Sequence, residues 1–266
     1  MAFGPDNRFQ TGASAWTQPF GRSAAVDAAQ LDAGLRSYML GVYNWMASGL
    51  LLTGIVAFLI VHTGASELFY QVVRTSRGNA TVPTILGWVA MLSPLAFVLV
   101  LSFGINRMSK TTAQALFWAF CAVMGASISN ILLIYTGASI ASTFFITASM
   151  FAGVSLYGYT TKADLTRMGS FMMMGLIGIL IAGLVNMFLQ SSALHFAISI
   201  IGVVVFVGLT AYDTQRIKAD YVEHAYAEGT ELAGKRSVFD ALGLYLNFIN
   251  LFQLLIQLIG VRQNSD

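Results

Sequence analysis

The length of the uncharged stretches constrains this chain more than any other feature. No Asp, Glu, Lys or Arg occurs in 37–66, 78–106, 111–161, 168–212 or 241–261. A bilayer hydrocarbon core about 30 Å thick is crossed by about 20 residues of helix. As one helix the stretch 111–161 would be roughly 75 Å long, so we expect it to fold back on itself inside the membrane. The same argument applies to 168–212.

The composition excludes the main soluble classes. Charged residues make up 10% of the chain and hydrophobic residues 56%, whereas an ordinary soluble domain carries about 25% charged residues. The net charge of +2 is too small for binding to a nucleic-acid backbone to dominate, so we expect no nucleic-acid partner. Cys121 is the single cysteine, which rules out an internal disulfide. An all-α membrane protein in contact with the lipid bilayer remains.

Two breaks divide the longest uncharged stretches. Gly and small polar residues at Tyr135–Ser139 interrupt the first, and Gln190-Ser191-Ser192 interrupts the second. Because each half is then long enough to cross the bilayer once, the pattern predicts seven transmembrane helices. The predicted spans are 38–61, 84–106, 112–135, 139–161, 168–190, 195–218 and 237–260.

The segment before the first span differs from the rest. Residues 1–35 are rich in Gly, Ala, Ser and polar side chains, so we expect a disordered tail followed by a transmembrane domain over 36–262. Cytoplasmic segments carry an excess of Lys and Arg. With the N-terminus in the cytoplasm, 11 of the 14 basic residues lie inside, and Arg74, Arg77 and Arg262 lie outside. The odd number of spans then places the C-terminus on the periplasmic side.

The last predicted span carries an unusual row of polar residues. Asp240, Gly243, Asn247, Asn250 and Gln257 follow a spacing that places them on one helical face. Lipid cannot satisfy these groups, so the row should face protein or water. One interpretation is hydrogen bonding between helices, worth about 0.6 kcal/mol per contact. The other is a polar pathway along a central helix, and the spacing leaves both open.

Asp213 ends the uncharged run of the sixth predicted span. A carboxylate near the membrane is costly unless it is paired or hydrated. Arg216 follows one helical turn later, and Arg107 ends the second predicted span on the same side of the membrane. Asp213 is therefore either a charge solvated at the cytoplasmic interface or a buried acid at the mouth of a path. A buried acid would be neutralised by Arg107 or hydrogen-bonded to the last span.

Motifs that would indicate catalysis or a cofactor are missing from the sequence. It contains no dinucleotide-binding or phosphate-binding glycine loop, no HExxH and no G-x-S-x-G. Tyr212-Asp213 is similar to half of an intramembrane aspartyl protease site, but such sites need a second aspartate. The last span has Asn247 instead, and Asp240 lacks the flanking glycines. We therefore expect neither an enzyme nor a bound cofactor.

Two motifs together resemble one family. The segments AYDTQRI, 211–217, and ALGLYLNFINLF, 241–252, resemble the Bax inhibitor-1 family of transmembrane Bax-inhibitor-motif proteins. The chain looks like a bacterial member over about 36–260. The resemblance implies two three-helix layers around a central C-terminal helix, in the bacterial inner membrane.

The resemblance also implies a pH-sensitive calcium leak. In such proteins an acid on the sixth span and an acid on the seventh share a proton, and an arginine ending the second span binds them. Asp213 matches the first acid and Arg107 the arginine, whereas Asn247 stands in place of the second acid. Two close carboxylates resist double ionisation, and an acid–amide pair does not. We therefore expect a weaker or acid-shifted pH response, unless Asp240 supplies the missing acid.

Two functions are compatible with these residues. Hard cations prefer oxygen ligands, and Asp213, Asn247 and Asn250 offer carboxylate and amide oxygens to calcium as a permeant ion. The alternative has no ion-conducting role, because the resemblance also implies bacterial members that modulate the membrane-anchored AAA protease and are its substrates. A tail over 1–35 would suit such a protease as a handle. The sequence leaves the oligomeric state open.

Overall fold

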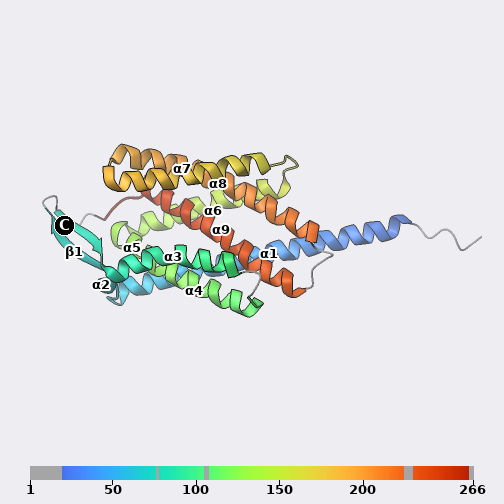
Figure 1. The fold of residues 1–266 in the computed structure, drawn as a ribbon, viewed down its shortest axis with the longest axis horizontal. Coiled ribbons are helices and arrows are strands. Elements are labelled where there is room, and N and C mark those ends of the chain that lie inside the picture. Colours follow the sequence, from blue (N-terminus) through green and yellow to red (C-terminus); the bar gives the residue numbers. More distant parts are fainter. Residues whose placement is uncertain (1–19, 76–77, 105–107, 225–229, 264–266) are drawn as a thin grey trace, which may run out of the picture.

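The described chain is almost entirely helical. The computed structural model describes residues 20–75, 78–104, 108–224 and 230–263 (Figure 1). The helices are α1 (Phe20–His62), α2 (Ser66–Phe69), α3 (Ile85–Gly104), α4 (Lys110–Ile128), α5 (Asn130–Ile134), α6 (Gly137–Thr160), α7 (Thr166–Leu189), α8 (Ser192–His224) and α9 (Thr230–Ile259). The strands β1 (Tyr70–Thr75) and β2 (Gly78–Pro83) pair as one antiparallel hairpin.

Six helical segments are long and apolar enough to cross a membrane, which confirms the expected all-α membrane protein. They are Gln30–His62, Lys110–Ile134, Gly137–Thr160, Thr166–Leu189, Ser192–Glu223 and Leu232–Ile259. The remaining predicted span, 84–106, coincides with α3, in which Ile85–Pro94 forms a shorter apolar segment. The count of seven spans therefore stays a prediction.

Both predicted breaks are confirmed by local hydrogen bonds. The Thr136 hydroxyl accepts a bond of 3.3 Å from the Ser139 N–H and caps the start of α6. Gln190 adopts a left-handed conformation with φ 49° and ends α7. The Asn186 side chain then accepts a bond of 3.0 Å from the Ser191 N–H. Each long uncharged stretch therefore turns back where capping side chains satisfy the free backbone groups.

The start of α1 differs from the predicted tail. The helix begins at Phe20, so 20–35 is helical and the prediction of a disordered tail over 1–35 is wrong for that part. Residues 1–19 lie outside the described chain. The segment 23–33 is rich in alanine, the residue with the highest helix propensity.

The loop after α1 also carries structure that was not predicted. The short helix α2 leads into the β1–β2 hairpin, in which Tyr70 pairs with Pro83 and Thr75 with Gly78. The strands contain Val72, Val73 and other β-branched residues, which favour extended backbone. The hairpin lies at the end of the molecule away from the start of α1 (Figure 1).

Helix α9 occupies the interior of the bundle. It contacts α1, α4, α6 and α8, and its Leu244 and Tyr245 are fully buried. The Tyr245 hydroxyl lies 2.6 Å from the Thr53 hydroxyl of α1. Phe117 and Phe120 of α4 pack edge-on against the same tyrosine ring. The last helix is thus held by both apolar packing and polar bonds.

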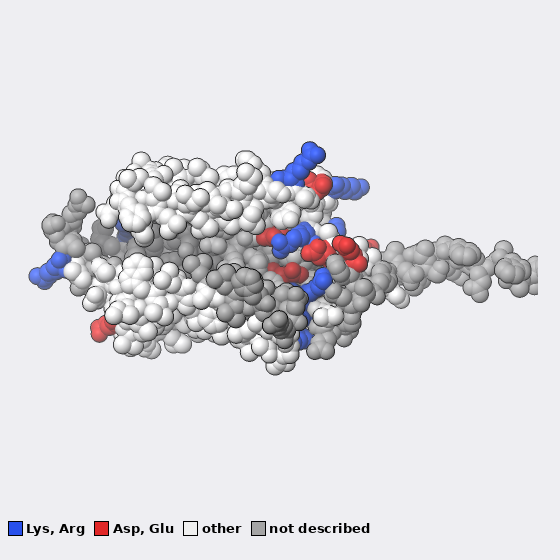
Figure 2. All heavy atoms as spheres, viewed as in Figure 1, with Lys and Arg blue, Asp and Glu red and all other residues white. Residues whose placement is uncertain are grey.

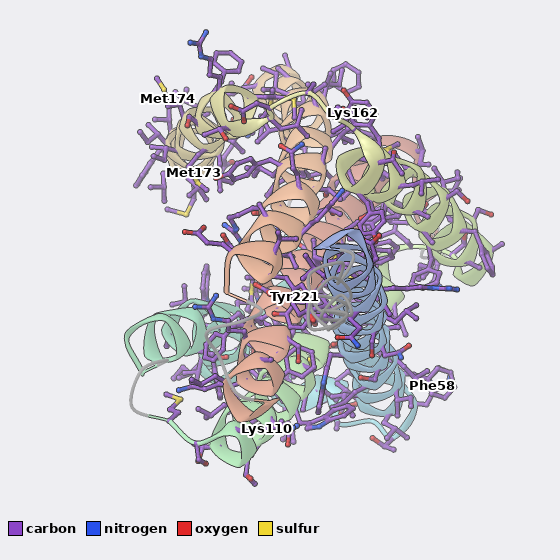
Figure 3. The ribbon with its side chains drawn as sticks, turned by 90° about the vertical axis from the view of Figure 1, so that its right-hand side faces the viewer. Phe58, Lys110, Lys162, Met173, Met174 and Tyr221 are labelled. Atoms are coloured by element: carbon purple, nitrogen blue, oxygen red, sulfur yellow. The ribbon has the colours of Figure 1, made fainter. Side chains whose placement is uncertain are left out.

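Most charges on the visible face gather at one end of the molecule. Figure 2 shows many blue and red side chains at the end where α8 leads toward α9 and a few at the opposite, hairpin end, while the described parts of the long sides are white. Outward-pointing side chains along these sides are apolar, such as Phe58 of α1 and Met174 of α7 (Figure 3). This distribution suits a chain whose charged end lies in water and whose sides contact lipid.

Close packing of α6 on α8 gives a first prediction. A Cβ at Gly158 would clash with the backbone carbonyl oxygen of Ala211, whereas a Cβ at Gly153 on the same helix would meet nothing. We expect Gly158→Ala to lower the free energy of unfolding by about 1–3 kcal/mol through overpacking. Gly153→Ala should leave it unchanged or slightly raised. Unfolding of the detergent-solubilised variants measures this, and equal stabilities would contradict the described contact.

Candidate functional site

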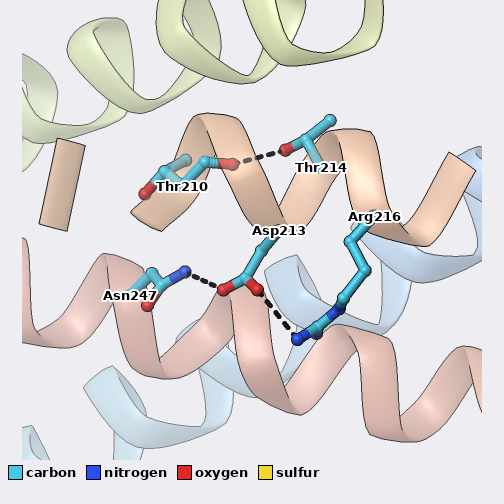
Figure 4. A network of polar contacts seen from close by, with 5 residues as sticks. All are labelled: Thr210, Asp213, Thr214, Arg216 and Asn247. Carbon is cyan, nitrogen blue, oxygen red and sulfur yellow. Dashed lines mark hydrogen bonds and ion pairs between the residues drawn. The ribbon is translucent and has the colours of Figure 1, made fainter. Parts of the chain in front are cut away.

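Asp213 lies where α8 faces α9, and both of its carboxylate oxygens have partners (Figure 4). The Asn247 side-chain N–H of α9 donates to Oδ2 over 2.7 Å. The Arg216 guanidinium lies 3.2 Å from Oδ1, one turn along α8. The Asp213 side chain is 14% exposed and that of Arg216 42%, while Asn247 is buried. The acid is thus held between a neutral amide inside the bundle and a cation near its surface.

This geometry decides between the interpretations that the sequence left open. Asp213 is mostly buried and hydrogen-bonded to the last helix, so it is not a charge solvated at the interface. Its cationic partner in the described chain is Arg216, three residues away on the same helical face. The predicted partner Arg107 lies outside the described residues. The predicted pairing of Asp213 with Asn247 is confirmed.

Thr214 begins a chain of hydroxyl groups on the other side of α8. Its hydroxyl donates to the Thr210 carbonyl oxygen over 2.8 Å. Because its one hydrogen is used there, the Ser155 hydroxyl of α6 donates to it over 3.0 Å. The Tyr43 hydroxyl of α1 donates in turn to Ser155 over 3.1 Å. This series of hydroxyl groups therefore joins α1, α6 and α8 next to Asp213. No pattern in the sequence predicted it.

Two further residues of the same motif fix α8 to α7 and to the preceding loop. The Gln215 side chain accepts a bond of 2.9 Å from the Leu165 N–H and donates over 2.8 Å to the Ala163 carbonyl oxygen. The Tyr212 ring packs against Gly169 of α7, where no Cβ has room. The neighbours of Asp213 thus fix the position of α8 through contacts on several of its sides.

The polar row on α9 is divided among different partners. Asp240 accepts a bond of 2.6 Å from the Tyr38 hydroxyl of α1, and Gln257 accepts one of 3.3 Å from Ser199 of α8. The Asn250 amide donates over 2.9 Å to a carbonyl oxygen of its own helix. The row therefore makes bonds between helices, and these bonds do not bring Asn250 or Asp240 to Asp213.

The site offers oxygen atoms but no cluster of charged ligands. In the part of the chain that the structure describes, no three His, Cys, Asp or Glu side chains come together in a way that would hold a metal ion. Calcium at Asp213 would therefore depend on neighbouring amide and hydroxyl oxygens. Such a set suits an ion in passage better than one held tightly, because affinity for calcium rises with the number of charged ligands.

The Asp213–Asn247 bond gives a second prediction. Asn247→Ala removes one of the two partners of a mostly buried carboxylate, and we expect the free energy of unfolding to fall by about 1–3 kcal/mol. Asn250→Ala is the matched control, because it removes an amide of the same helix whose bond in the described chain goes to its own backbone. Chemical unfolding in detergent measures both variants. An equal loss in the two would show that the bond to Asp213 adds nothing.

Comparison with known proteins agrees with the motifs at this site. A family model described as "Inhibitor of apoptosis-promoting Bax1" matches residues 35–264. The chain is 45% identical to inner membrane protein YbhL of Escherichia coli, over 92% of this chain and 99% of YbhL. An uncharacterized protein of Rickettsia prowazekii is 47% identical over 88% of this chain and 93% of its own length. One of Caulobacter vibrioides is 44% identical over 91% and 96%. With its family motifs at the contact between α8 and α9, the chain belongs to the Bax inhibitor-1 family of membrane proteins.

Proposed function

We propose that this protein is a non-enzymatic cation leak pathway of the bacterial inner membrane, with calcium as the permeant ion and Asp213 as its gate. The observation that carries the proposal is the Asp213–Asn247 hydrogen bond, which joins α8 to the interior helix α9 near the charged end. The Escherichia coli relative is an inner membrane protein, which supports the location.

Under this proposal, the described contacts of Asp213 correspond to a closed gate. A cation approaching Asp213 needs carboxylate oxygens to replace part of its hydration shell. Both oxygens are engaged, one by Asn247 and one by Arg216. The positive charge of Arg216 repels a second cation from the carboxylate, and Asn247 ties the carboxylate to α9. We therefore propose that a cation binds Asp213 when one of these partners leaves, and release of Asn247 requires α8 and α9 to separate at this level.

The pairing with an amide determines the proposed response to pH. Two carboxylates at this distance would share a proton, and losing it would drive them apart. Asn247 makes the same contact as a neutral donor, so the bond holds while Asp213 is ionised. We therefore propose that the flux through this chain changes less with pH, or changes at lower pH, than a two-acid site would require.

We also propose the arrangement of the whole bundle in the membrane. Helix α3 would be the seventh span, and two layers of three helices would surround α9. The contacts of α9 with four helices support its central place. The charged end would face the cytoplasm with the N-terminus, in agreement with the positive-inside rule.

A second role rests on the length of α1. This helix has 43 residues and is roughly 65 Å long, about twice the thickness of the hydrocarbon core. It extends beyond the other helices at its N-terminal end (Figure 1). We propose that this extension, with the residues before it, is the handle by which the membrane-anchored AAA protease binds and degrades the chain.

Calcium flux into proteoliposomes at pH 6 and pH 8 tests the gate. We expect the wild type to leak weakly with little difference between the two pH values. Asn247→Asp creates two close carboxylates, so its flux should differ strongly between them. Asp213→Asn removes the charged ligand and should lower the flux at both.

Asn250→Asp is the matched control for this experiment, because it adds an acid to the same helix at a position that does not bond Asp213. It should leave the weak pH dependence unchanged. An equal pH response from both added acids would refute the role of position 247. If no variant moves calcium, the leak proposal fails and the protease role stands alone.

Deletion of residues 2–30 tests the protease handle. We expect the half-life of the protein to lengthen in cells that contain the AAA protease, because the handle is gone, and calcium flux to stay unchanged. A chase after blocking protein synthesis measures the half-life, with protease-deficient cells as the control. If the shortened protein is degraded at the wild-type rate, the proposal that the protease binds this extension is refuted.

A further inference from the structure

A groove between α1 and α6 opens on the lipid-facing side of the bundle. It has a volume of about 610 Å³, and α9 contributes Phe248 to its floor. Its walls are almost entirely apolar and include Met39 and Met46 of α1 and Phe144 and Phe151 of α6. Methionine side chains adapt to flexible apolar ligands because they have several rotatable bonds. The groove takes no part in the contacts of Asp213.

The length of the groove matches one leaflet of a bilayer. Along α1 it runs from Arg36 to Leu50, four turns of helix or roughly 21 Å. Half of a bilayer, including its headgroup region, is about 20–22 Å thick. Arg36 is nearer than Leu50 to the N-terminal end of α1, which is the end where most charges gather. With that end at a membrane surface, the groove would extend from the level of the headgroups to the middle of the membrane.

Positive charge stands at the mouth of the groove. Arg36 is exposed, and within the described ranges it makes no ion pair or hydrogen bond. Tyr159 also lines this end, and the Lys218 amine lies 5.0 Å from the centre of its ring. An anion at the mouth would therefore meet Arg36, which has no such partner among the described residues, and the nearby Lys218 amine, which donates to the Tyr159 carbonyl oxygen over 2.9 Å.

The adjoining groove along α1 lacks this feature. It has a volume of about 550 Å³, shares Leu50 and Phe144 with the first, and continues toward Leu59 with no charged residue in its lining. Both grooves suit hydrocarbon. The arginine at its end distinguishes the first and points to an occupant with an apolar chain and a negative headgroup.

We propose that the groove between α1 and α6 binds one anionic phospholipid from the leaflet at the charged end of the protein. An acyl chain lies along Met39, Met46 and Leu50, and the phosphate lies at Arg36. Ser155 lines the groove and also donates to Thr214, the neighbour of Asp213. The lipid therefore packs against two of the helices that the hydroxyl chain joins.

Native mass spectrometry of the full chain in detergent tests the proposal. The probes are phosphatidylglycerol and phosphatidylcholine with identical acyl chains. We expect one phosphatidylglycerol to be retained with about fivefold preference, because one basic residue contributes about 1 kcal/mol toward an anionic lipid. Arg36→Gln should abolish the preference. Arg167→Gln, which changes an exposed arginine of α7 outside the groove, should keep it.

A second pair of variants tests the place of the acyl chain. Ala152→Trp fills the groove from α6 and should release both lipids, whereas Ala141→Trp on an exposed position of the same helix should retain them. Equal retention of the two lipids by the wild type would overturn the proposal, as would retention of phosphatidylglycerol by Ala152→Trp. A wild-type dimer that Ala152→Trp dissociates would assign the groove to a second copy of the chain and also overturn it. If Ala152→Trp does not fold, Arg36→Gln decides alone, because its side chain is exposed.

Discussion

The bilayer offers no hydrogen bond to a buried polar side chain, and the whole arrangement of α9 depends on this constraint. Among the described residues, every buried side-chain nitrogen and oxygen has a partner within the protein. On α9 these partners come from two sides, since Tyr245 is bonded to Thr53 of α1 and Asn247 to Asp213 of α8. In lipid the helices pack without a hydrophobic driving force, so close packing and hydrogen bonds between helices decide the register. These polar contacts therefore help to fix the position of α9 relative to α1 and α8.

In the motif around Asp213, residues 211–217, successive side chains contact different neighbours on different sides of α8. Successive residues of a helix point about 100° apart, so a run of five faces every direction. Asp213 meets α9, Thr214 meets α6, and Gln215 holds the loop before α7. A rotation or shift of α8 at this level disturbs all three contacts together. Under the proposed function, opening at Asp213 is thus a movement of α8 against several neighbours rather than of one side chain.

Sequence alone located the elements that the membrane dictates. An uncharged run longer than the bilayer must turn, which placed the breaks before α6 and α8, and the family resemblance implied that Asn247 pairs with Asp213. Arg216 on the same helix is the cationic partner of Asp213 among the described residues. The expected part of Arg107 stays a prediction, because that residue lies outside them. Composition failed at the start of α1, since an alanine-rich segment looks like a tail and folds as a helix. The bond of Ser155 to Thr214 gave no signal, because hydroxyls in apolar helices often bond their own backbone.

Asn247 separates two properties that a pair of acids would combine. A shared proton both joins two carboxylates and makes their contact depend on pH. Here the amide N–H supplies the joining bond without a proton shared between two acids, and Arg216 balances the charge of Asp213 from the other side. Under the proposed function, the contact between α8 and α9 therefore depends little on pH. Under the proposed function, release must come from a force on the helices, and the chain from Tyr43 through Ser155 to Thr214 links Asp213's own helix to α1 and α6.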